Sequence, residues 1–330
     1  MKEEIAKTLK SADTEDWLDY HVVRPFSYYW AKFFAKLGVS PNSVTIMSMV
    51  IGAASSLFFV HGSYHYEALS GLILNIVGLL LLFLADIFDC ADGQLARMTG
   101  KKSPLGRILD GLAGFTWYVP IYAALVYRFY LHHNIEFAWL GIADTQSNVL
   151  IATAVVFVLA LLSGVCGIAP QQRLADYYIQ AHLFFLKGEA GSELDNSVQQ
   201  RAKYEAMGPE TPWYERLFQR NYIDYTRLQE KRTPQFQRLL AVMRAAAAKP
   251  DADLARHRQE FVSRSKPILT YNGMLTFNFR TSYFLVFCLL DVPVLTFLFE
   301  IVCMSLLALY VNRRHERMCR NLANTIALEK

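Results

Sequence analysis

The sequence is poor in charged residues. Lys, Arg, Asp and Glu make up 19% of its 330 residues, whereas soluble domains average about a quarter. Hydrophobic residues account for 53% and aromatic residues for 14%, which excludes an intrinsically disordered chain. The formal net charge of +4 is too small to indicate a nucleic-acid partner. This composition indicates an integral membrane protein whose aromatic side chains anchor it at the bilayer interfaces.

Cysteine is also scarce, and its pattern excludes two further classes. The five cysteines include no CxxC pair, so the sequence offers neither a disulfide framework nor a zinc-finger signature. The segment 1–20 contains no apolar core, and we therefore expect no cleavable signal peptide.

Long apolar runs, by contrast, are frequent. A membrane-spanning helix needs about 20 predominantly apolar residues, and six stretches are apolar enough to predict one. They are residues 44–60, 68–85, 108–131, 149–169, 282–290 with the preceding turn, and 293–311. The last two are separated only by the turn at 291–293, which makes their boundaries the least defined. The sequence thus predicts an all-α polytopic membrane protein with about six transmembrane helices.

The distribution of Lys and Arg predicts the orientation of these helices. The connections at 61–67, 131–148 and 291–293 contain no Lys or Arg, whereas residues 1–36 contain six and residues 173–266 contain sixteen. Because Lys and Arg accumulate on the cytoplasmic side of membrane proteins, we expect both termini in the cytoplasm.

Five segments are expected along the chain: 1–37, 38–172 with spans one to four, 173–266, 267–312 with the last two spans, and a basic tail at 313–330. Residues 15–37 combine aromatic and basic side chains, which fits an amphipathic helix in the membrane interface or a helix packed on the bundle. Residues 173–266 hold 16 basic and 12 acidic residues, with breaks at 188–191 and 208–212. They predict a cytoplasmic insertion of two to four helices.

Four aspartates are the candidate residues for the chemistry of this protein. Asp86, Asp89 and Asp92 follow one another at three-residue spacing at the inner end of the second span, and Asp110 follows at the start of the third. A carboxylate inside a membrane costs about 2.5–3.5 kcal/mol, so a counter-charge is required. Oxygen ligands without His or Cys favour a hard divalent cation, Mg²⁺ or Mn²⁺.

Other polar or small residues accompany the aspartates. Gly93 and Ala96 leave the helix face bare for a flat or phosphorylated ligand, and Arg97 can pair with a carboxylate or a phosphate. Arg280, at the start of the fifth span, is expected to extend its charge to the membrane surface. The alternative is that it binds a phosphate of the acceptor.

The complete pattern is Asp89-x2-Asp92-Gly93-x2-Ala96-Arg97-x8-Gly106-x3-Asp110. It resembles the signature of the CDP-alcohol phosphotransferase family. The segment at 38–45, which contains Asn42, also resembles the start of that family's first helix. The resemblance extends over residues 36–170 and leaves 173–266 outside the pattern.

The resemblance implies an enzyme that makes a phospholipid or sphingolipid headgroup. It would transfer a phospho-alcohol or phosphatidyl group from a CDP-linked donor to an alcohol acceptor and release CMP. Asp89, Asp92 and Asp110 would hold Mg²⁺ or Mn²⁺. Asn42, Gly93, Ala96, Arg97 and Gly106 would form the donor-binding side. A homodimer in a bacterial inner membrane, with its active site toward the cytoplasm, would fit the family.

One departure from the family pattern bears on catalysis. The family has a fourth aspartate four residues after Asp110, assigned as the base, and this chain has Gly114 there. The chain is then inactive, or the acceptor is deprotonated without a protein base, or Asp86 supplies the base. Asp86 and Gly114 lie at matching depth, about 4.5–6 Å beyond their metal-ligand neighbours. Alternatives of other classes are a non-catalytic nucleotide- or lipid-binding protein and a divalent-metal carrier.

Overall fold

The computed structural model describes residues 11, 13–63, 68–101, 103–247 and 253–328. These residues form two compact units. The first contains 16–168 and 277–303, and the second contains 13–15, 169–276 and 304–328.

Every regular element in the described part of the chain is a helix, which confirms the predicted all-α class. The elements are η1 (Asp19–Val23), α2 (Arg24–Lys36), α3 (Pro41–Val60), α4 (Ala68–Thr99), α5 (Pro104–Leu131), α6 (Asn134–Leu140), α7 (Gln146–Leu162), η2 (Ser163–Ile168), α8 (Ala169–Lys187), η3 (Glu189–Gly191), α9 (Ser197–Glu205), α10 (Trp213–Arg232), α11 (Pro234–Ala247), α12 (Leu254–Gly273), α13 (Phe277–Leu289), α14 (Leu295–Phe299), η4 (Glu300–Met304) and α15 (Ser305–Leu328).

Five helical runs among the described residues are long and apolar enough to cross a membrane: Pro41–Val60, Leu69–Thr99, Ile108–Leu131, Gln146–Lys187 and Leu295–Leu328. They include the first four predicted spans and the sixth. The predicted fifth span coincides with α13, which has only 13 residues, fewer than the roughly 20 that a spanning helix needs.

Local sequence explains where α5 and α3 begin. The side chain of Ser103 caps α5 by accepting a hydrogen bond from the Gly106 N–H, and Pro104 occupies the first turn; both are typical of helix starts. α3 begins in the same way at Ser40 and Pro41. α4 has 32 residues and is therefore about 48 Å long at 1.5 Å per residue. It exceeds the roughly 30 Å hydrocarbon layer.

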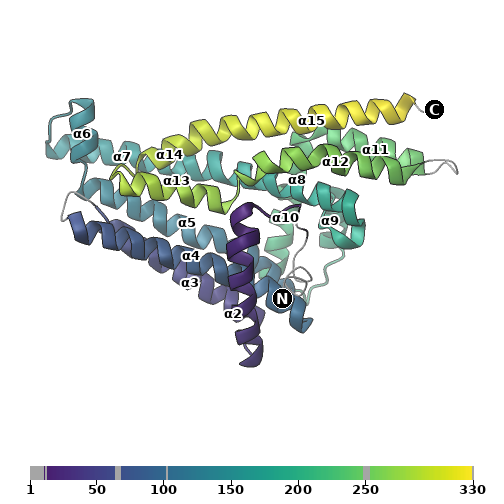
Figure 1. Cartoon of the computed structure of the whole chain (residues 1–330), viewed down its shortest axis with the longest axis horizontal. Coiled ribbons are helices and arrows are strands. Elements are labelled where there is room, and N and C mark those ends of the chain that lie inside the picture. The colour runs from purple at the N-terminus through teal and green to yellow at the C-terminus, as the bar shows by residue number, and fades with distance from the viewer. Residues whose placement is uncertain (1–10, 12, 64–67, 102, 248–252, 329–330) are drawn as a thin grey trace. The chain divides into compact units, whose positions relative to one another are not determined.

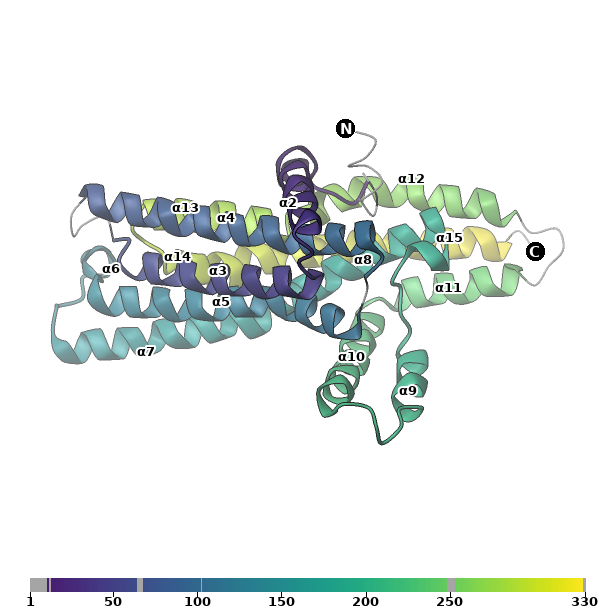
Figure 2. The ribbon, with the colours of Figure 1, turned by 90° about the horizontal axis from the view of Figure 1, so that it is seen from below.

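In the first unit, α3, α4 and α5 lie side by side, and α2 crosses them (Figures 1 and 2). Trp117 of α5 is buried and donates a hydrogen bond to the Ser48 carbonyl of α3 at 3.1 Å. A Cβ atom at Gly52 would collide with the Trp117 ring. Small residues on α3 thus let α5 approach closely, as is common between membrane helices.

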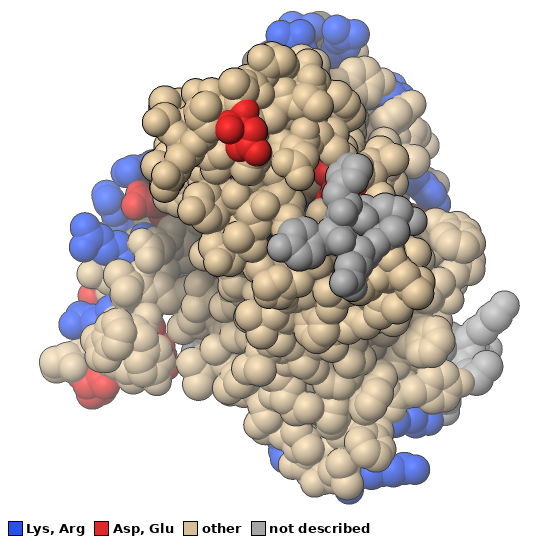
Figure 3. All heavy atoms as spheres, turned by 90° about the vertical axis from the view of Figure 1, so that its left-hand side faces the viewer, with Lys and Arg blue, Asp and Glu red and all other residues tan. Residues whose placement is uncertain are grey.

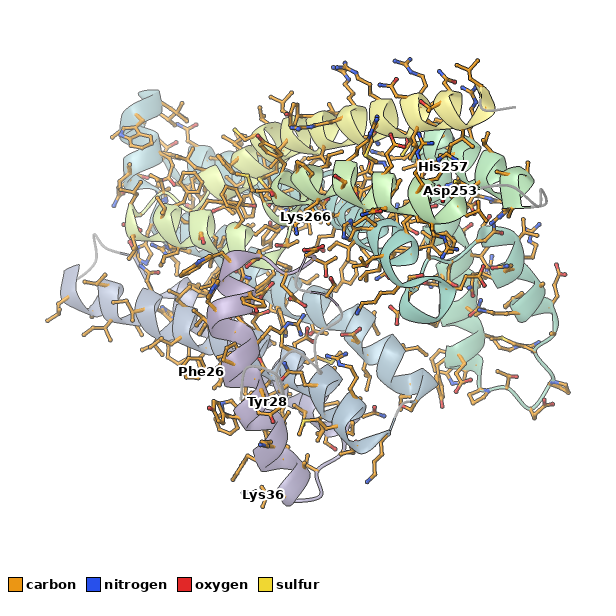
Figure 4. The ribbon with its side chains drawn as sticks, turned by 45° about the vertical axis from the view of Figure 1, so that its right-hand side comes forward. Phe26, Tyr28, Lys36, Asp253, His257 and Lys266 are labelled. Carbon is orange, nitrogen blue, oxygen red and sulfur yellow. The ribbon has the colours of Figure 1, made fainter. Side chains whose placement is uncertain are left out.

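α2 has two different faces. Ala31 and Phe34 of α2, together with Val23 at the end of η1, pack with α4 residues such as Phe88 in one buried cluster. On the opposite face, Phe26 is 54% exposed; Figure 4 labels Phe26, Tyr28 and Lys36 along this helix. The packing alternative for residues 15–37 is therefore confirmed for the inner face, whereas the interfacial role of the outer face stays a prediction.

A buried ion pair closes one end of the first unit. Arg128 of α5 donates to Asp291 at 2.5 Å and to the Asn75 side chain of α4 at 3.0 Å. Ser63 donates to the second carboxylate oxygen of Asp291 at 2.8 Å. Asp291 has a φ of 57° in the turn after α13. The network ties this turn to α4 and α5 and neutralises an arginine that is 1% exposed, because an unpaired charge in the bilayer would be costly.

Arg280 differs from its prediction. It is 1% exposed and forms an ion pair with Glu300 at 2.5 Å. Glu300 is also 1% exposed. The arginine therefore does not extend to the surface. The sequence does not reveal this partner, because Glu300 belongs to a later helix and meets Arg280 only when α13 and η4 pack together.

Two of the connections without Lys or Arg, 131–148 and 291–293, lie at the end of the first unit that carries α6. In Figure 3 this end faces the viewer. Most of the surface of this end that faces the viewer is uncharged. The orientation in the membrane stays a prediction.

The second unit is built around an aromatic core. The rings of Phe185 and Phe261 stack at 3.9 Å, and Phe236 of α11 packs beside them. α9 and α10 form a hairpin that projects from the other helices of this unit (Figure 2). Five α-helices, α8 to α12, fall wholly or partly within 173–266, more than the two to four predicted. The predicted breaks at 188–191 and 208–212 both separate helices.

Candidate active site

The motif residues lie on two helices of the first unit that both pack against α3. The second half of α4 carries Asp86, Asp89 and Asp92, and the first half of α5 carries Asp110. Asp86 and Asp92 are buried, Asp89 is half-buried, and Asp110 is exposed. Helix pairing has thus brought together carboxylates from two separate elements.

Asp89 lies at the centre of this group. It is within electrostatic range of Asp110, Asp92 and Asp86, and Arg24 opposes their negative charge. One of its carboxylate oxygens is buried and has no hydrogen-bond partner in the described structure. Such a concentration of negative charge with an unsatisfied oxygen suits a bound cation.

The donor set fits a hard divalent cation. Three carboxylates without nitrogen or sulfur are the ligands that Mg²⁺ and Mn²⁺ prefer. Among the described residues, the oxygens of Asp89, Asp92 and Asp110 do not all lie within 4.8 Å of one another. Asp110 is the exposed member.

Asp92 is positioned by a residue for which the sequence analysis gave no role. The Thr45 hydroxyl of α3 donates a short hydrogen bond to the Asp92 carboxylate, and Thr45 is 2% exposed. A hydrogen-bond donor of this kind orients a metal ligand. Asp92 is also within electrostatic range of Arg97. The position of Thr45 in the 38–45 segment was a sequence signal for a role in the site. Its partner Asp92 could not be inferred from the sequence, because Asp92 lies on a different helix.

The two motif glycines have different surroundings. A Cβ atom at Gly93 would lie 3.4 Å from Nη1 of Arg97, so the glycine makes room for the guanidinium beside the helix. A Cβ atom at Gly106 would lie 2.8 Å from Oδ1 of Asn42, which also accepts a hydrogen bond from Ser103 at 3.2 Å. Gly106 and Asn42 therefore meet where α3 and α5 begin. Ala96 is half-buried on the same helix as Gly93.

There is empty space beside Gly114, the position of the missing aspartate. A Cβ atom at Gly114 would have no neighbouring atom within 4 Å. One turn further along α5, the hydroxyl of Tyr118 is buried without a hydrogen-bond partner among the described residues. Tyr118 is within electrostatic range of Arg280, Glu300 and Asp86.

Asp86 faces the N-terminal segment. Its charged neighbours are Asp19, Arg24 and Asp16, and one of its carboxylate oxygens is buried without a hydrogen-bond partner in the described structure. Asp16 accepts hydrogen bonds from the Asp19 N–H at 2.8 Å and from Asn278 at 2.9 Å. The sequence analysis gave these N-terminal charges no site role, because they are distant from Asp86 along the chain.

Comparison with known proteins agrees with this site. The CDP-alcohol phosphatidyltransferase family profile matches residues 38–165, the segment that contains every predicted ligand and Gly114. Over residues 38–165 this chain is similar to the CDP-alcohol phosphatidyltransferase family.

Three relatives illustrate the range of the family. Choline/ethanolaminephosphotransferase 1 of Arabidopsis thaliana is 34% identical over 94 residues, which cover 28% of this chain and 24% of that protein. Cholinephosphotransferase 1 of Saccharomyces cerevisiae is 32% identical over 101 residues, 30% of this chain and 25% of that protein. Archaetidylinositol phosphate synthase of Aeropyrum pernix is 34% identical over 80 residues, 24% of this chain and 36% of that protein.

The chain thus covers about a quarter to a third of the length of these relatives. No solved structure matches it significantly.

Proposed function

We propose that this protein is a CDP-alcohol phosphotransferase of membrane lipid synthesis. It transfers a phospho-alcohol or phosphatidyl group from a CDP-linked donor to an alcohol acceptor. The observation that carries the proposal is the group of carboxylates around Asp89, with its unpartnered buried oxygen, inside the segment that matches the family.

The proposed reaction replaces one phosphoester bond by another. The acceptor oxygen bonds to the phosphorus that carries the transferred group, the bond from that phosphorus to the CMP oxygen breaks, and the acceptor proton passes to a base. Asp89, Asp92 and Asp110 would hold Mg²⁺ or Mn²⁺, which neutralises the diphosphate and the departing CMP when bound. Thr45 holds the Asp92 carboxylate in position.

The remaining motif residues shape the donor side. Arg97, beside Gly93, supplies a cation for the diphosphate. Asn42 and Gly106 adjoin at the start of α3 and α5, where an exposed nucleotide has access to both. Ala96 keeps the intervening face of α4 small. These assignments rest on the match to the family and on the proximity of the side chains.

For the base we propose Asp86. The space beside Gly114 is open, and Asp86 has a free buried oxygen and lies within electrostatic range of Tyr118, one turn beyond Gly114. A carboxylate in that position can accept the acceptor proton. The competing proposal, a non-catalytic binding protein of the same fold, is favoured by the same open space at Gly114.

The names of the relatives suggest the substrates. Two are named for choline or ethanolamine phosphate transfer and one for archaetidylinositol phosphate synthesis. We propose a phospho-alcohol of the ethanolamine, choline or inositol phosphate type and a diacylglycerol- or ceramide-like lipid. The active site would face the cytoplasm, because the Lys- and Arg-rich segments lie on that side. A homodimer and a bacterial inner membrane stay predictions, since the matched relatives come from a plant, a yeast and an archaeon.

CMP release from defined donors tests the proposal. The full-length protein in lipid vesicles would be given CDP-choline, CDP-ethanolamine or CDP-diacylglycerol, each with candidate acceptors and with Mg²⁺ or Mn²⁺. We expect CMP release from one donor class, abolished by chelator and by Asp92→Asn. Asp224→Asn, which alters an exposed carboxylate of α10, is the matched control and should retain the full rate. The carrier alternative predicts cation uptake into vesicles without CMP release.

Donor binding without turnover would favour the non-catalytic protein. Neither binding nor CMP release with any donor would refute the proposed function. Full activity in the presence of chelator would refute the metal-dependent mechanism.

A further inference from the structure

The second unit contains a cluster of metal-ligating side chains on α15, separate from the motif residues. Nδ1 of His315, a carboxylate oxygen of Glu316 and Sγ of Cys319 all lie within 4.8 Å of one another. Cys319 is fully buried and His315 is 2% exposed. Among the described residues, this is the single group of three or more such ligands.

The distances within the cluster suit a tetrahedral ion. Nδ1 of His315 and Sγ of Cys319 are 3.6 Å apart. Zn–N and Zn–S bonds of about 2.0–2.1 and 2.3 Å at a tetrahedral angle separate the two ligand atoms by roughly 3.6 Å. The Glu316 oxygen lies 3.9 Å from the same nitrogen, whereas about 3.4 Å is expected for a bound carboxylate. A small movement of Glu316 would close that difference.

The Glu316 carboxylate is already held in place from outside the cluster. Its two oxygens accept hydrogen bonds from the backbone N–H groups of Gln235 at 2.7 Å and Phe236 at 3.3 Å. These groups lie at the start of α11, so Glu316 joins α11 to α15. Hydrogen bonds to a ligating carboxylate are typical of the outer shell of metal sites.

An independent observation comes from Tyr178 of α8. Its ring stacks on His315 with centroids 4.1 Å apart, and the side chain is 1% exposed. Its hydroxyl has no hydrogen-bond partner in the part of the chain that the structure describes. Tyr178 is within electrostatic range of both Glu316 and Cys319. A buried hydroxyl without a partner is unusual in folded proteins, so the core beside His315 contains an unsatisfied polar group.

We propose that His315, Glu316 and Cys319 bind a Zn²⁺ ion, with the Tyr178 ring stacked on the His315 ligand. A mixed nitrogen, sulfur and oxygen set suits zinc better than Mg²⁺ or Mn²⁺. Binding would release the proton of the Cys319 thiol. The ion would fasten α15, through Glu316, to α11 and would stabilise the second unit. The site does not depend on the proposed transferase activity.

Metal analysis of the purified full-length protein tests this proposal. The protein would be purified without a polyhistidine tag or chelator, and its metals measured by plasma mass spectrometry. We expect about one zinc per chain, reduced at least tenfold in Cys319→Ser and His315→Gln, because each change removes one of few ligands. Cys303→Ser, at an exposed cysteine, is the matched control and should keep its zinc. So should Asp92→Asn, which belongs to the other site.

A second readout covers variants that fold poorly. Replacing zinc by Co²⁺ in the unmodified protein should produce a near-ultraviolet thiolate-to-cobalt absorption band, retained in Cys303→Ser and lost in Cys319→Ser. Unmodified protein that holds less than about one-tenth of an equivalent of any transition metal after incubation with zinc, and that shows no cobalt band, would overturn the proposal. Equal zinc in Cys319→Ser and in the unmodified chain would overturn it as well.

Discussion

At the scale of single residues, the candidate active site contains buried carboxylate oxygens without a hydrogen-bond partner as well as a carboxylate that is held by a hydrogen bond. Asp89 and Asp86 each keep a buried carboxylate oxygen without a hydrogen-bond partner among the described residues, whereas Asp92 is held by Thr45. Burying a charged oxygen without compensation is expensive. Asp92 therefore has a fixed position, whereas Asp86 and Asp89 each have an oxygen that is available to a ligand or a proton.

The role of Asp86 can be tested directly at this scale. If Asp86 is the base, Asp86→Asn should slow CMP release by on the order of 10²–10⁴, the usual contribution of a general base, with donor binding nearly unchanged. Gly114→Asp in the same background should restore part of the rate, because the space beside Gly114 accepts a side chain. Steady-state rates and donor titrations on both variants measure the effect.

The outcomes of this experiment discriminate among the alternatives. An unchanged rate in Asp86→Asn would show that the acceptor is activated without this carboxylate. Loss of donor binding would make Asp86 part of the metal site.

At the scale of elements, close helix approach positions the motif. α3 and α5 meet at two glycines, Gly52 beneath Trp117 and Gly106 beside Asn42. α2 in turn brings Arg24 toward Asp86 and Asp89. Because these contacts lie between helices, their loss should change the site through the position of whole elements.

Gly106→Ala tests the approach of α5 to α3. The added methyl group would lie 2.8 Å from the Asn42 side chain, closer than van der Waals contact permits, so the start of α5 or Asn42 must move. We expect a lower Tm, with a loss of about 1–3 kcal/mol as for other overpacked sites, and a weaker affinity for the CDP donor. Gly114→Ala is the matched control for stability, because nothing lies within 4 Å of its added atom, and its Tm should not fall. An unchanged Tm in Gly106→Ala would contradict the close approach.

The short helix α6 should respond to pH through Glu136. Burial, assisted by the charge of Asp291, raises the pKa of Glu136 to about 7, although Arg128 and His133 oppose the shift. The folded state therefore binds the proton more tightly than the unfolded state, whose pKa is about 4.3. The contribution of Glu136 to stability is largest below that value and is lost as the pH rises toward 7.

Hydrogen exchange of the α6 amides measures this effect. Their protection, corrected for the intrinsic pH dependence of exchange, should fall between about pH 4 and 7. Glu136→Gln should remove the dependence, because the amide does not titrate. An identical pH profile in Glu136→Gln would assign the effect to another group.

At the scale of the whole chain, charge distribution predicts which parts share a side of the membrane. The second unit contains the sixteen Lys and Arg residues of 173–266, whereas residues 131–148 of the first unit have none. The number of positive residues in cytoplasmic segments exceeds that in exported loops. The sequence alone thus predicts that the 188–191 loop is cytoplasmic, the side that we propose for the active site.

Cysteine labelling in intact cells checks this topology. Ser192→Cys should resist a membrane-impermeant thiol reagent, and Asp144→Cys, in the opposite connection, should react. The unmodified chain, with exposed Cys166 and Cys303, measures the background. Labelling of Ser192→Cys from outside, with Asp144→Cys protected, would reverse the orientation and the proposed side of catalysis.

The sequence by itself determined the helical class, the locations of the five membrane-length helices, with close boundaries for Pro41–Val60 and Ile108–Leu131, and the motif of Asp89, Asp92 and Asp110. Each of these depends on local composition or fixed spacing, because a helix forms from neighbouring residues and a bilayer selects for apolar length. Ser103 and Pro104 likewise predict the start of α5 without any tertiary contact.

Only the tertiary structure decided the partners of the buried charges. Arg280 with Glu300, Arg128 with Asp291, Thr45 with Asp92 and the N-terminal charges beside Asp86 are all pairings between separate elements. The same holds for the cluster on α15, which packs against Tyr178 of the distant helix α8 and whose spacing matches no metal-binding motif. Sequence periodicity gives the face of a helix, whereas the crossing of two helices determines which side chains meet.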